Sequence, residues 1–108
     1  MSWKVTFLED AIRDIEELDK SQKIQVIKSI NKVSANPLPS IKGGYGKPLG
    51  NKSGNNLSNL YKIKLKKSGI RIVYKLEEIE NEMCIVVVAA RKDNEVYKEA
   101  AKRNKIQR

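Results

Sequence analysis

The stretch from residue 61 to residue 75, YKIKLKKSGIRIVYK, constrains the fold of this chain more than any other part of it. Apolar and charged residues alternate along both halves of the stretch, and a period of two is typical of β-strands. Between the halves, Lys67, Ser68 and Gly69 form a predicted turn. The pattern therefore predicts a β-hairpin with one apolar face and one face rich in cations.

The side chains of this hairpin divide clearly between the two predicted faces. The apolar face holds Tyr61, Ile63, Leu65, Ile70, Ile72, Tyr74 and Leu76. The opposite face holds Lys62, Lys64, Lys66, Arg71, Val73 and Lys75. Like charges that oppose one another across strands destabilise a sheet. Such a crowded cationic face therefore indicates a surface that binds an anion.

The chain has 108 residues and a formal net charge of +9, and this charge is unevenly distributed. Residues 1–36 carry six basic and six acidic side chains, whereas residues 37–108 carry sixteen basic and seven acidic ones. No acidic residue lies between Asp19 and Glu77. A basic field confined to one part of the chain favours binding to a polyanion, such as nucleic acid, over a surface that is merely lysine-rich.

The chain has no histidine and only one cysteine, Cys84, which excludes several kinds of active site. Histidine acid–base pairs, catalytic triads and histidine metal sites cannot form, and we expect neither a metal nor another cofactor. Cys84 lies in an apolar run, so we expect a buried residue in a cytoplasmic protein without an internal disulfide. That run is too short to span a membrane, and no secretory signal is visible.

The N-terminal part of the chain predicts a strand followed by two helices. Residues 3–7 alternate and contain β-branched and aromatic side chains. Apolar residues then recur at helical spacing over residues 8–18 and 24–33, with Ser21 as the predicted N-cap of the second helix and Pro37 after its end. Because the gap between the helices is short, we expect them to run antiparallel.

The C-terminal part predicts two elements after the hairpin. Residues 83–90 are apolar on both faces, as in a central strand, and residues 96–101 have the spacing of a last helix. These patterns predict one α+β domain over residues 1–108: an N-terminal strand, the antiparallel helical hairpin, then a mostly antiparallel sheet of about four strands with a C-terminal helix. We expect the helices to lie against one face of the sheet.

Residues 37–59 are rich in Gly, Pro, Ser and Asn, and we interpret them as a long connection that is either functional or mobile. The GGYGK sequence at residues 43–47 lacks the rest of a P-loop. It therefore gives only weak support for nucleotide binding.

The segments GKPLGNKSGNNLSNLYKIKLKKSGIRIVYKL, MCIVVVAA and RKDNEVYKEAAKR resemble the RelE toxins of bacterial toxin–antitoxin systems. The resemblance covers most of the chain in element order and is most specific from Leu57 to Arg103, above all in YKIKL, SGIRIVY and EVYKEA. It implies a RelE-like fold and a small ribosome-dependent endoribonuclease that cuts mRNA in the ribosomal A site. It also implies a cognate antitoxin that neutralises the activity. The glycine-rich loop over residues 37–56 looks longer than in the family.

The resemblance also implies which residues form the site. The implied catalytic residues are the two alternating lysines of the family strand, Lys62 and Lys64, the arginine after its turn, Arg71, the catalytic arginine, Arg91, and the C-terminal tyrosine, Tyr97. A shift of one residue would exchange the roles of Arg91 and Lys92. We expect further RNA contacts from Lys66, Lys67, Lys75 and Lys92.

RNA can be cleaved by attack of its own 2′-OH on the adjacent phosphate, which needs a base, charge neutralisation on the phosphate and a proton for the leaving oxygen. Crowded cations disfavour the charged form of a lysine, so Lys64 can serve as the base without histidine. Lys62 and Arg71 would neutralise the phosphate, and Arg91 would bind it and assist the leaving 5′-oxygen. Tyr97 would stack on a base or orient the 2′-OH.

Each of these residues also has a purely structural interpretation. Lys62 and Lys64 fit the solvated face of an amphipathic strand, and Arg71 fits an ion pair as well as a phosphate ligand. Arg91 fits a cation that snorkels from the end of an apolar strand, and Tyr97 fits the core side of a helix. Their joint occurrence at the spacing of the family favours the catalytic interpretation.

Three functions remain open from the sequence. The mRNA endoribonuclease is favoured. The related ParE toxins share the fold and poison gyrase, although they generally lack the basic catalytic set. The third function is a catalytically silent module that binds RNA or an antitoxin. For a toxin, we expect the exposed basic face to be masked by an acidic, amphipathic segment of the antitoxin, and we expect no membrane and no small-molecule cofactor.

Overall fold

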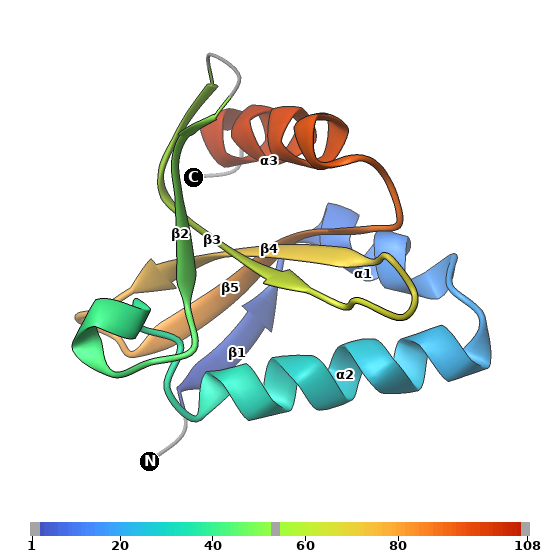
Figure 1. The fold of residues 1–108 in the computed structure, drawn as a ribbon, viewed down its shortest axis with the longest axis horizontal. Helices are drawn as coiled ribbons and strands as arrows, with labels where there is room; N and C mark the ends of the chain where they lie inside the picture. Colours follow the sequence, from blue (N-terminus) through green and yellow to red (C-terminus); the bar gives the residue numbers. More distant parts are fainter. Residues whose placement is uncertain (1–2, 53–54, 107–108) are drawn as a thin grey trace.

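The computed structural model describes residues 3–52 and 55–106, and Figure 1 shows its fold. In chain order the elements are β1 (Lys4–Phe7), α1 (Glu9–Glu16), α2 (Lys20–Ser34), the 3-10 helix η1 (Ser40–Lys42), β2 (Lys47–Lys52), β3 (Asn55–Lys64), β4 (Arg71–Glu77), β5 (Glu82–Ala89) and α3 (Asp93–Ile106). The predicted α+β class and element order are confirmed. The described residues form five strands, whereas we expected about four.

The strands form one mixed sheet in the order β1-β5-β4-β3-β2. β1 pairs with β5 in parallel, and the other three pairings are antiparallel, which confirms the mostly antiparallel prediction. β5 lies inside the sheet, and its residues from Met83 to Val88 are all buried. This explains the continuous apolar run, because both faces of the strand are covered.

The unexpected strand is β2, in the second half of the predicted connection, part of which, Ser53 and Gly54, lies outside the described residues. Pro48 and Gly50 weaken its strand pattern, and the register with β3 shifts between them. Gly50 has a φ of +62°, which a residue with a side chain rarely adopts. Pairing with the long strand β3 therefore decides this structure, and the local sequence does not.

The first half of the predicted connection is fixed to the sheet by Tyr74. Its hydroxyl donates a hydrogen bond to the carbonyl oxygen of Pro37 at 2.9 Å. A Cβ atom at Gly46 would lie 2.5 Å from that oxygen and 2.8 Å from the Tyr74 hydroxyl. Close packing against Pro37 and Tyr74 thus requires a glycine at residue 46.

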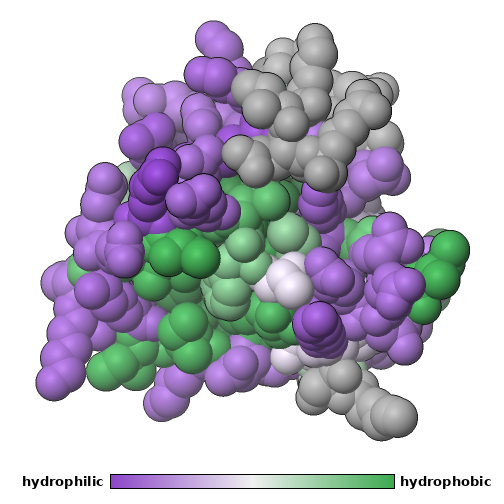
Figure 2. Space-filling view, turned by 180° about the vertical axis from the view of Figure 1, so that it is seen from behind, coloured by the Kyte–Doolittle hydropathy of each residue, from purple (hydrophilic) through white to green (hydrophobic). Residues whose placement is uncertain are grey.

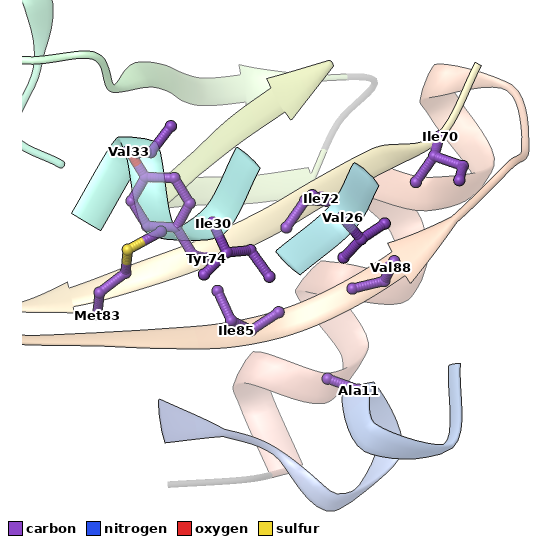
Figure 3. Packing of buried hydrophobic residues seen from close by; sticks show 10 residues of the cluster. All are labelled: Ala11, Val26, Ile30, Val33, Ile70, Ile72, Tyr74, Met83, Ile85 and Val88. Atoms are coloured by element: carbon purple, nitrogen blue, oxygen red, sulfur yellow. The ribbon is translucent and has the colours of Figure 1, made fainter. Parts of the chain in front are cut away.

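The helices cover both faces of the sheet, so the prediction that they lie against one face is wrong (Figure 1). The side facing α2 buries Ala11, Val26, Ile30, Val33, Ile70, Ile72, Tyr74, Met83, Ile85 and Val88, which Figure 3 shows; we call this cluster the α2-side core. The side facing α3 buries Leu49, Leu60, Val73, Val86, Val87, Val96, Tyr97 and Ala100, the α3-side core. Cover on one face would leave the second apolar face of β5 in water.

The predicted division of the hairpin into an apolar and a cationic face is confirmed. Tyr61, Ile63 and Leu65 from the first strand all pack against the α2-side core. Val73, from the other predicted face, lies in the α3-side core. Residues that alternate along the hairpin thus lie on opposite sides of the sheet, in two different environments.

The helix α2 begins at an N-cap that the sequence analysis placed two residues too late. Asp19, and not Ser21, caps the helix: its Oδ1 accepts from the backbone N–H of Gln22 at 2.8 Å. The Gln22 side chain accepts in return from the Asp19 N–H at 3.1 Å. This reciprocal pair is a capping box, and such a cap contributes about 1 kcal/mol to helix stability.

Arg103 anchors the helix α3 to the rest of the fold. Its Nη1 donates to Asp14 Oδ2 at 2.7 Å and to the carbonyl oxygen of Val86 at 2.9 Å. Its Nη2 donates to Asp14 Oδ1 at 3.2 Å, and its Nε donates to Glu99 Oε2 at 2.8 Å. Asp14 Oδ2 also accepts from the N–H of Val88 at 3.0 Å. The side chains of Arg103 and Asp14 therefore bind the carbonyl oxygen of Val86 and the N–H of Val88, in the part of β5 that extends beyond the end of β1.

The surface is mostly polar, with a few exposed apolar side chains. Figure 2 shows hydrophobic residues gathered near the centre of one face, with hydrophilic residues around them. Among the exposed large hydrophobic residues are Ile12, Ile24 and Ile27 of the two N-terminal helices. No helix in the described part of the chain is long and apolar enough to cross a membrane.

Candidate active site

The hairpin of β3 and β4 places the predicted site at the end where its turn lies. Leu65 and Ile70 close the turn through a backbone hydrogen bond of 2.8 Å, and the N–H of Gly69 donates to the carbonyl oxygen of Leu65 at 2.8 Å. Gly69 has a φ of +73°, which favours glycine. The turn is therefore wider than the predicted three residues and ends directly before Arg71, the first residue of β4.

The two predicted catalytic lysines lie on β3, on the side of the sheet that faces α3. Lys64 is exposed and pairs across the hairpin with Arg71. Lys62 pairs with Val73, and its Nζ lies 5.9 Å from the centre of the Tyr97 ring, over the ring face. That distance is typical of a cation–π contact. The fold thus brings Lys62 of β3 next to Tyr97 of α3, and Lys64 of β3 opposite Arg71 of β4.

Arg71 is held by three acceptors from three segments. Its Nε donates to Oδ1 of Asp93, and its Nη1 donates to the carbonyl oxygens of Gly69 at 2.8 Å and Arg91 at 2.5 Å. The Arg71 side chain is only 18% exposed, whereas Asp93 is 46% exposed. The ion pair that the sequence left open as an alternative therefore exists. No contact of Nη2 is present among the described residues, so this nitrogen remains available for a ligand.

An open pocket of about 490 Å³ lies beside Arg71. It is lined by Ser68, Gly69, Arg71, Ala90, Arg91, Lys92 and Glu95. Two arginines and a lysine thus surround one opening, which suits a phosphate group because arginine can bind its oxygens in a bidentate manner. Arg91 and Lys92 both line the pocket, so either can take the role of the family arginine.

Tyr97 is buried in the α3-side core and is only 5% exposed. Burial raises the pKa of its hydroxyl, the negative charge of Asp93 raises it further, and the positive charge of Arg71 lowers it. The hydroxyl is therefore protonated at neutral pH. Little of the ring surface is open for an RNA base to stack on, and the Lys62 ammonium lies over the ring.

The predicted RNA contacts are divided between two ends of the sheet. Lys66 and Lys67 lie exposed on the β3–β4 turn, and Lys92 lines the pocket. Lys75 lies farther along β4 and lines a different pocket with Asn59, Leu76, Glu77, Glu82, Cys84 and Asn104. Lys75 lies four positions after Arg71 along β4, which corresponds to about 13 Å. The fold therefore does not bring Lys75 to the same site.

Two acidic residues of the site, Asp93 and Glu95, were not among the predicted site residues. Both lie in the first turn of α3, where carboxylates interact favourably with the helix dipole. Asp93 binds Arg71, and Glu95 lines the pocket. An acidic residue two positions after Arg91 at the start of a helix was the only available signal. Over residues 3–52 and 55–106, no group of acidic or thiol side chains is arranged to hold a metal ion.

Comparison with known proteins gives one consistent family. The chain is 33% identical to a RelE-like toxin protein of Escherichia coli over 104 residues, which covers 95% of this chain and 98% of the relative. It is 29% identical to the mRNA interferase toxin RelE of Escherichia coli K12 over 103 residues, again 95% and 98% of the two chains. No protein-family model matches the chain.

Solved structures agree with these sequence relatives. The free Escherichia coli toxin RelE with two arginine-to-alanine substitutions superposes with a TM-score of 0.70 at 27% identity, covering 95% of this chain and 98% of that one. The Escherichia coli RelBE toxin–antitoxin complex matches with a TM-score of 0.64 at 23% identity, covering 84% and 99%, and shows the fold alone. With this fold and a relative at 33% identity over nearly its whole length, the chain belongs to the RelE family of toxins.

Proposed function

We propose that this chain is a ribosome-dependent mRNA endoribonuclease that blocks translation and is neutralised by a cognate antitoxin. The observation that carries the proposal is the pocket between Arg71 and Arg91, with Lys64 directly across the hairpin from Arg71. A relative at 29% identity is named an mRNA interferase, which supports mRNA as the substrate.

In the proposed reaction, the 2′-oxygen attacks the adjacent phosphorus while the bond from phosphorus to the 5′-oxygen breaks. The neutral Lys64 Nζ takes the proton of the 2′-OH, and the leaving 5′-oxygen takes a proton from the solvent while Arg91 donates a hydrogen bond to it. The products are a 2′,3′-cyclic phosphate and a free 5′-OH. Water is not consumed, because the 2′-OH is the nucleophile. No metal is needed in this proposal, because cationic side chains neutralise the charge that develops on the phosphate.

Three cations share this neutralisation in the proposal. Arg91 binds the phosphate in the pocket and donates a hydrogen bond to the leaving oxygen, with Lys92 as the alternative at the same place. Arg71 offers Nη2 to the phosphate, since its other two nitrogens already have protein acceptors. Lys62, over the Tyr97 ring, adds positive charge near the attacking oxygen.

The proposed antitoxin follows from charge and from the family. The exposed cations of the β3–β4 turn lie together on one end of the molecule, and an acidic, amphipathic segment would cover them. Solved relatives have been obtained as toxin–antitoxin complexes. The same segment would also keep mRNA away from the pocket, so binding of the antitoxin would prevent cleavage.

Replacement of the base and of the phosphate ligand tests the proposal. Arg91→Ala and Lys64→Ala are each expected to lower cleavage of mRNA at least about 100-fold, because each removes a group that acts in the transition state. Both side chains are exposed, so the unfolding transition should not change. Cleavage would be measured by primer extension on a defined mRNA in a translation extract.

Three results would contradict the proposal. Cleavage by both variants at the wild-type rate would remove Lys64 and Arg91 from the mechanism. Intact mRNA together with DNA damage signalling after induction would instead indicate a toxin that acts on gyrase. Salt-dependent RNA binding without cleavage at any protein concentration would indicate a catalytically silent module.

A further inference from the structure

Asp93 is an acidic residue at the centre of a basic site. It is the first residue of α3, and its Oδ1 accepts the Nε–H of Arg71. The same guanidinium binds the carbonyl oxygens of Gly69 and Arg91. The Arg71 side chain thus joins the β3–β4 turn, the β5–α3 connection and the start of α3.

A carboxylate at this position works against the binding of RNA. It lies beside the phosphate pocket, and its negative charge repels a phosphate group. The ion pair also contributes little to stability, because Asp93 is 46% exposed and exposed pairs are worth about 0–1 kcal/mol. Neither RNA affinity nor stability therefore accounts for Asp93.

The orientation of the Arg71 side chain does give a role for Asp93. A free arginine side chain has many rotamers, and ordering them costs up to about 2 kcal/mol. The charge-assisted bond from Asp93, together with the two carbonyl oxygens, fixes the planar guanidinium on two edges. The remaining nitrogen, Nη2, is then fixed in direction. The bond to the Arg91 carbonyl also fixes the main chain that carries the Arg91 side chain.

We propose that Asp93 is a positioning residue, which holds Arg71 and, through Arg71, the main chain of Arg91 in the geometry that the transition state requires. The inference rests on the proposed endoribonuclease function and adds to it. Asp93 touches neither the RNA nor the reacting atoms in this proposal. Its effect should therefore appear in the turnover rate and not in substrate binding.

Glu95 provides a matched control for Asp93. It lies in the same turn of α3, lines the same pocket and carries the same charge, and it forms no ion pair among the described side chains. Asp93→Asn and Glu95→Gln therefore remove the same charge from nearly the same place. Only the first substitution weakens the hold on Arg71.

The experiment measures cleavage of a defined mRNA on ribosomes over a range of ribosome–mRNA concentrations. Glu95→Gln measures the effect of removing a negative charge from the pocket lining, and its turnover is the reference with which the Asp93 variants are compared; we expect it to lower the concentration at half-saturation, because less negative charge then repels the RNA. For Asp93→Asn and Asp93→Ala we expect turnover to fall about 10-fold to 100-fold, because small misplacements of catalytic groups cost that much, with half-saturation no higher than in wild type. Asp93→Glu keeps the charge and the acceptor and should recover most of the turnover.

The outcomes separate this inference from the proposed function. If wild type cleaves and Asp93→Asn cleaves like Glu95→Gln, the inference is wrong and the function stands. An effect of Asp93→Ala on half-saturation alone would also overturn it, since Asp93 would then act on binding. If wild type does not cleave mRNA on ribosomes, the proposed function fails and the inference fails with it. Circular dichroism would confirm that each variant is folded, and Asp93→Asn is the milder change if Asp93→Ala unfolds.

Discussion

Arg71 and Arg103 lie on the α3 side of the same sheet, and they are bonded in different ways. All three nitrogens of Arg103 have protein acceptors, and two of its partners are carboxylates that it contacts through short hydrogen bonds. Arg71 has one carboxylate and two carbonyl oxygens, and its Nη2 has no partner among the described residues. Both side chains are mostly buried: that of Arg103 is 13% exposed and that of Arg71 is 18% exposed.

The difference supports the roles proposed for the two arginines. Arg103 uses each of its three nitrogens to bind α1, β5 or α3 itself, so it stabilises the contact between these elements. Arg71 is held firmly on two edges and left open on the third, beside a pocket. Rigid support with one free donor is the arrangement expected of a group that must be preorganised.

Removal of Arg103 should have the largest effect on stability. Arg103→Ala leaves Asp14 as a mostly buried carboxylate without its cation, which costs about 3 kcal/mol or more. Of its hydrogen-bond donors among the described residues, Asp14 would keep only the N–H of Val88. Urea unfolding would show a lower midpoint, while cleavage per folded molecule should not change.

The control is Arg13→Ala, which removes a 65% exposed arginine that pairs with Glu9 and Asp10 at 3.4 Å. Its expected effect is below about 0.5 kcal/mol. Equal losses for the two variants would show that Arg103 is no more important to the fold than a surface arginine.

Removal of Arg71 should have the opposite pattern of effects, with a smaller loss of stability and a large loss of cleavage. Arg71→Ala loses the ion pair with the half-exposed Asp93 and two hydrogen bonds to carbonyl oxygens, so we expect a stability loss of about 1–2 kcal/mol, smaller than for Arg103. Cleavage should fall at least about 100-fold, because a preorganised donor to the phosphate is lost. Unfolding and primer extension on the same preparations would measure both. A stability loss larger than that of Arg103→Ala, with cleavage retained, would reverse the roles assigned to the two arginines.

The smallest effect is expected in the titration of Tyr97. Burial raises the pKa of its hydroxyl, and the charge of Asp93 raises it further, so Asp93→Asn should lower this pKa. A raised pKa means that the fold favours the protonated tyrosine. The stability contribution is therefore present below pH of about 10, the ordinary value for tyrosine, and is lost as the pH rises through the folded value.

Absorbance of tyrosinate during a pH titration would measure the shift, with Tyr97→Phe to identify its part of the signal. Glu99→Gln is the matched control, because it removes a carboxylate from Arg103 and leaves Asp93 in place. An identical shift from both substitutions would mean that Tyr97 does not sense the Arg71 cluster specifically.

Much of the fold could be predicted from the sequence because its signals are local. Alternation over residues 61–76 gave both faces of the hairpin, and helical spacing gave all three helices. The strand β2 could not be predicted, since Pro48 and Gly50 obscure its pattern and only pairing with β3 makes it a strand. Ser21 is a suitable N-cap by residue type, but Asp19 caps the helix, because Gln22 lies three residues after Asp19 and completes the capping box.

The amino-acid sequence alone determined that one face of the β3–β4 hairpin would be apolar and the other cationic, because the direction of a side chain from a strand depends only on its position along the chain. The tertiary structure decided what the cationic face became. Arg71 and Asp93 are 22 residues apart, and their contact depends on how β5 leads into α3 across the opposite side of the sheet. No local pattern contains that information, since it arises only when two buried faces of β5 must both be covered.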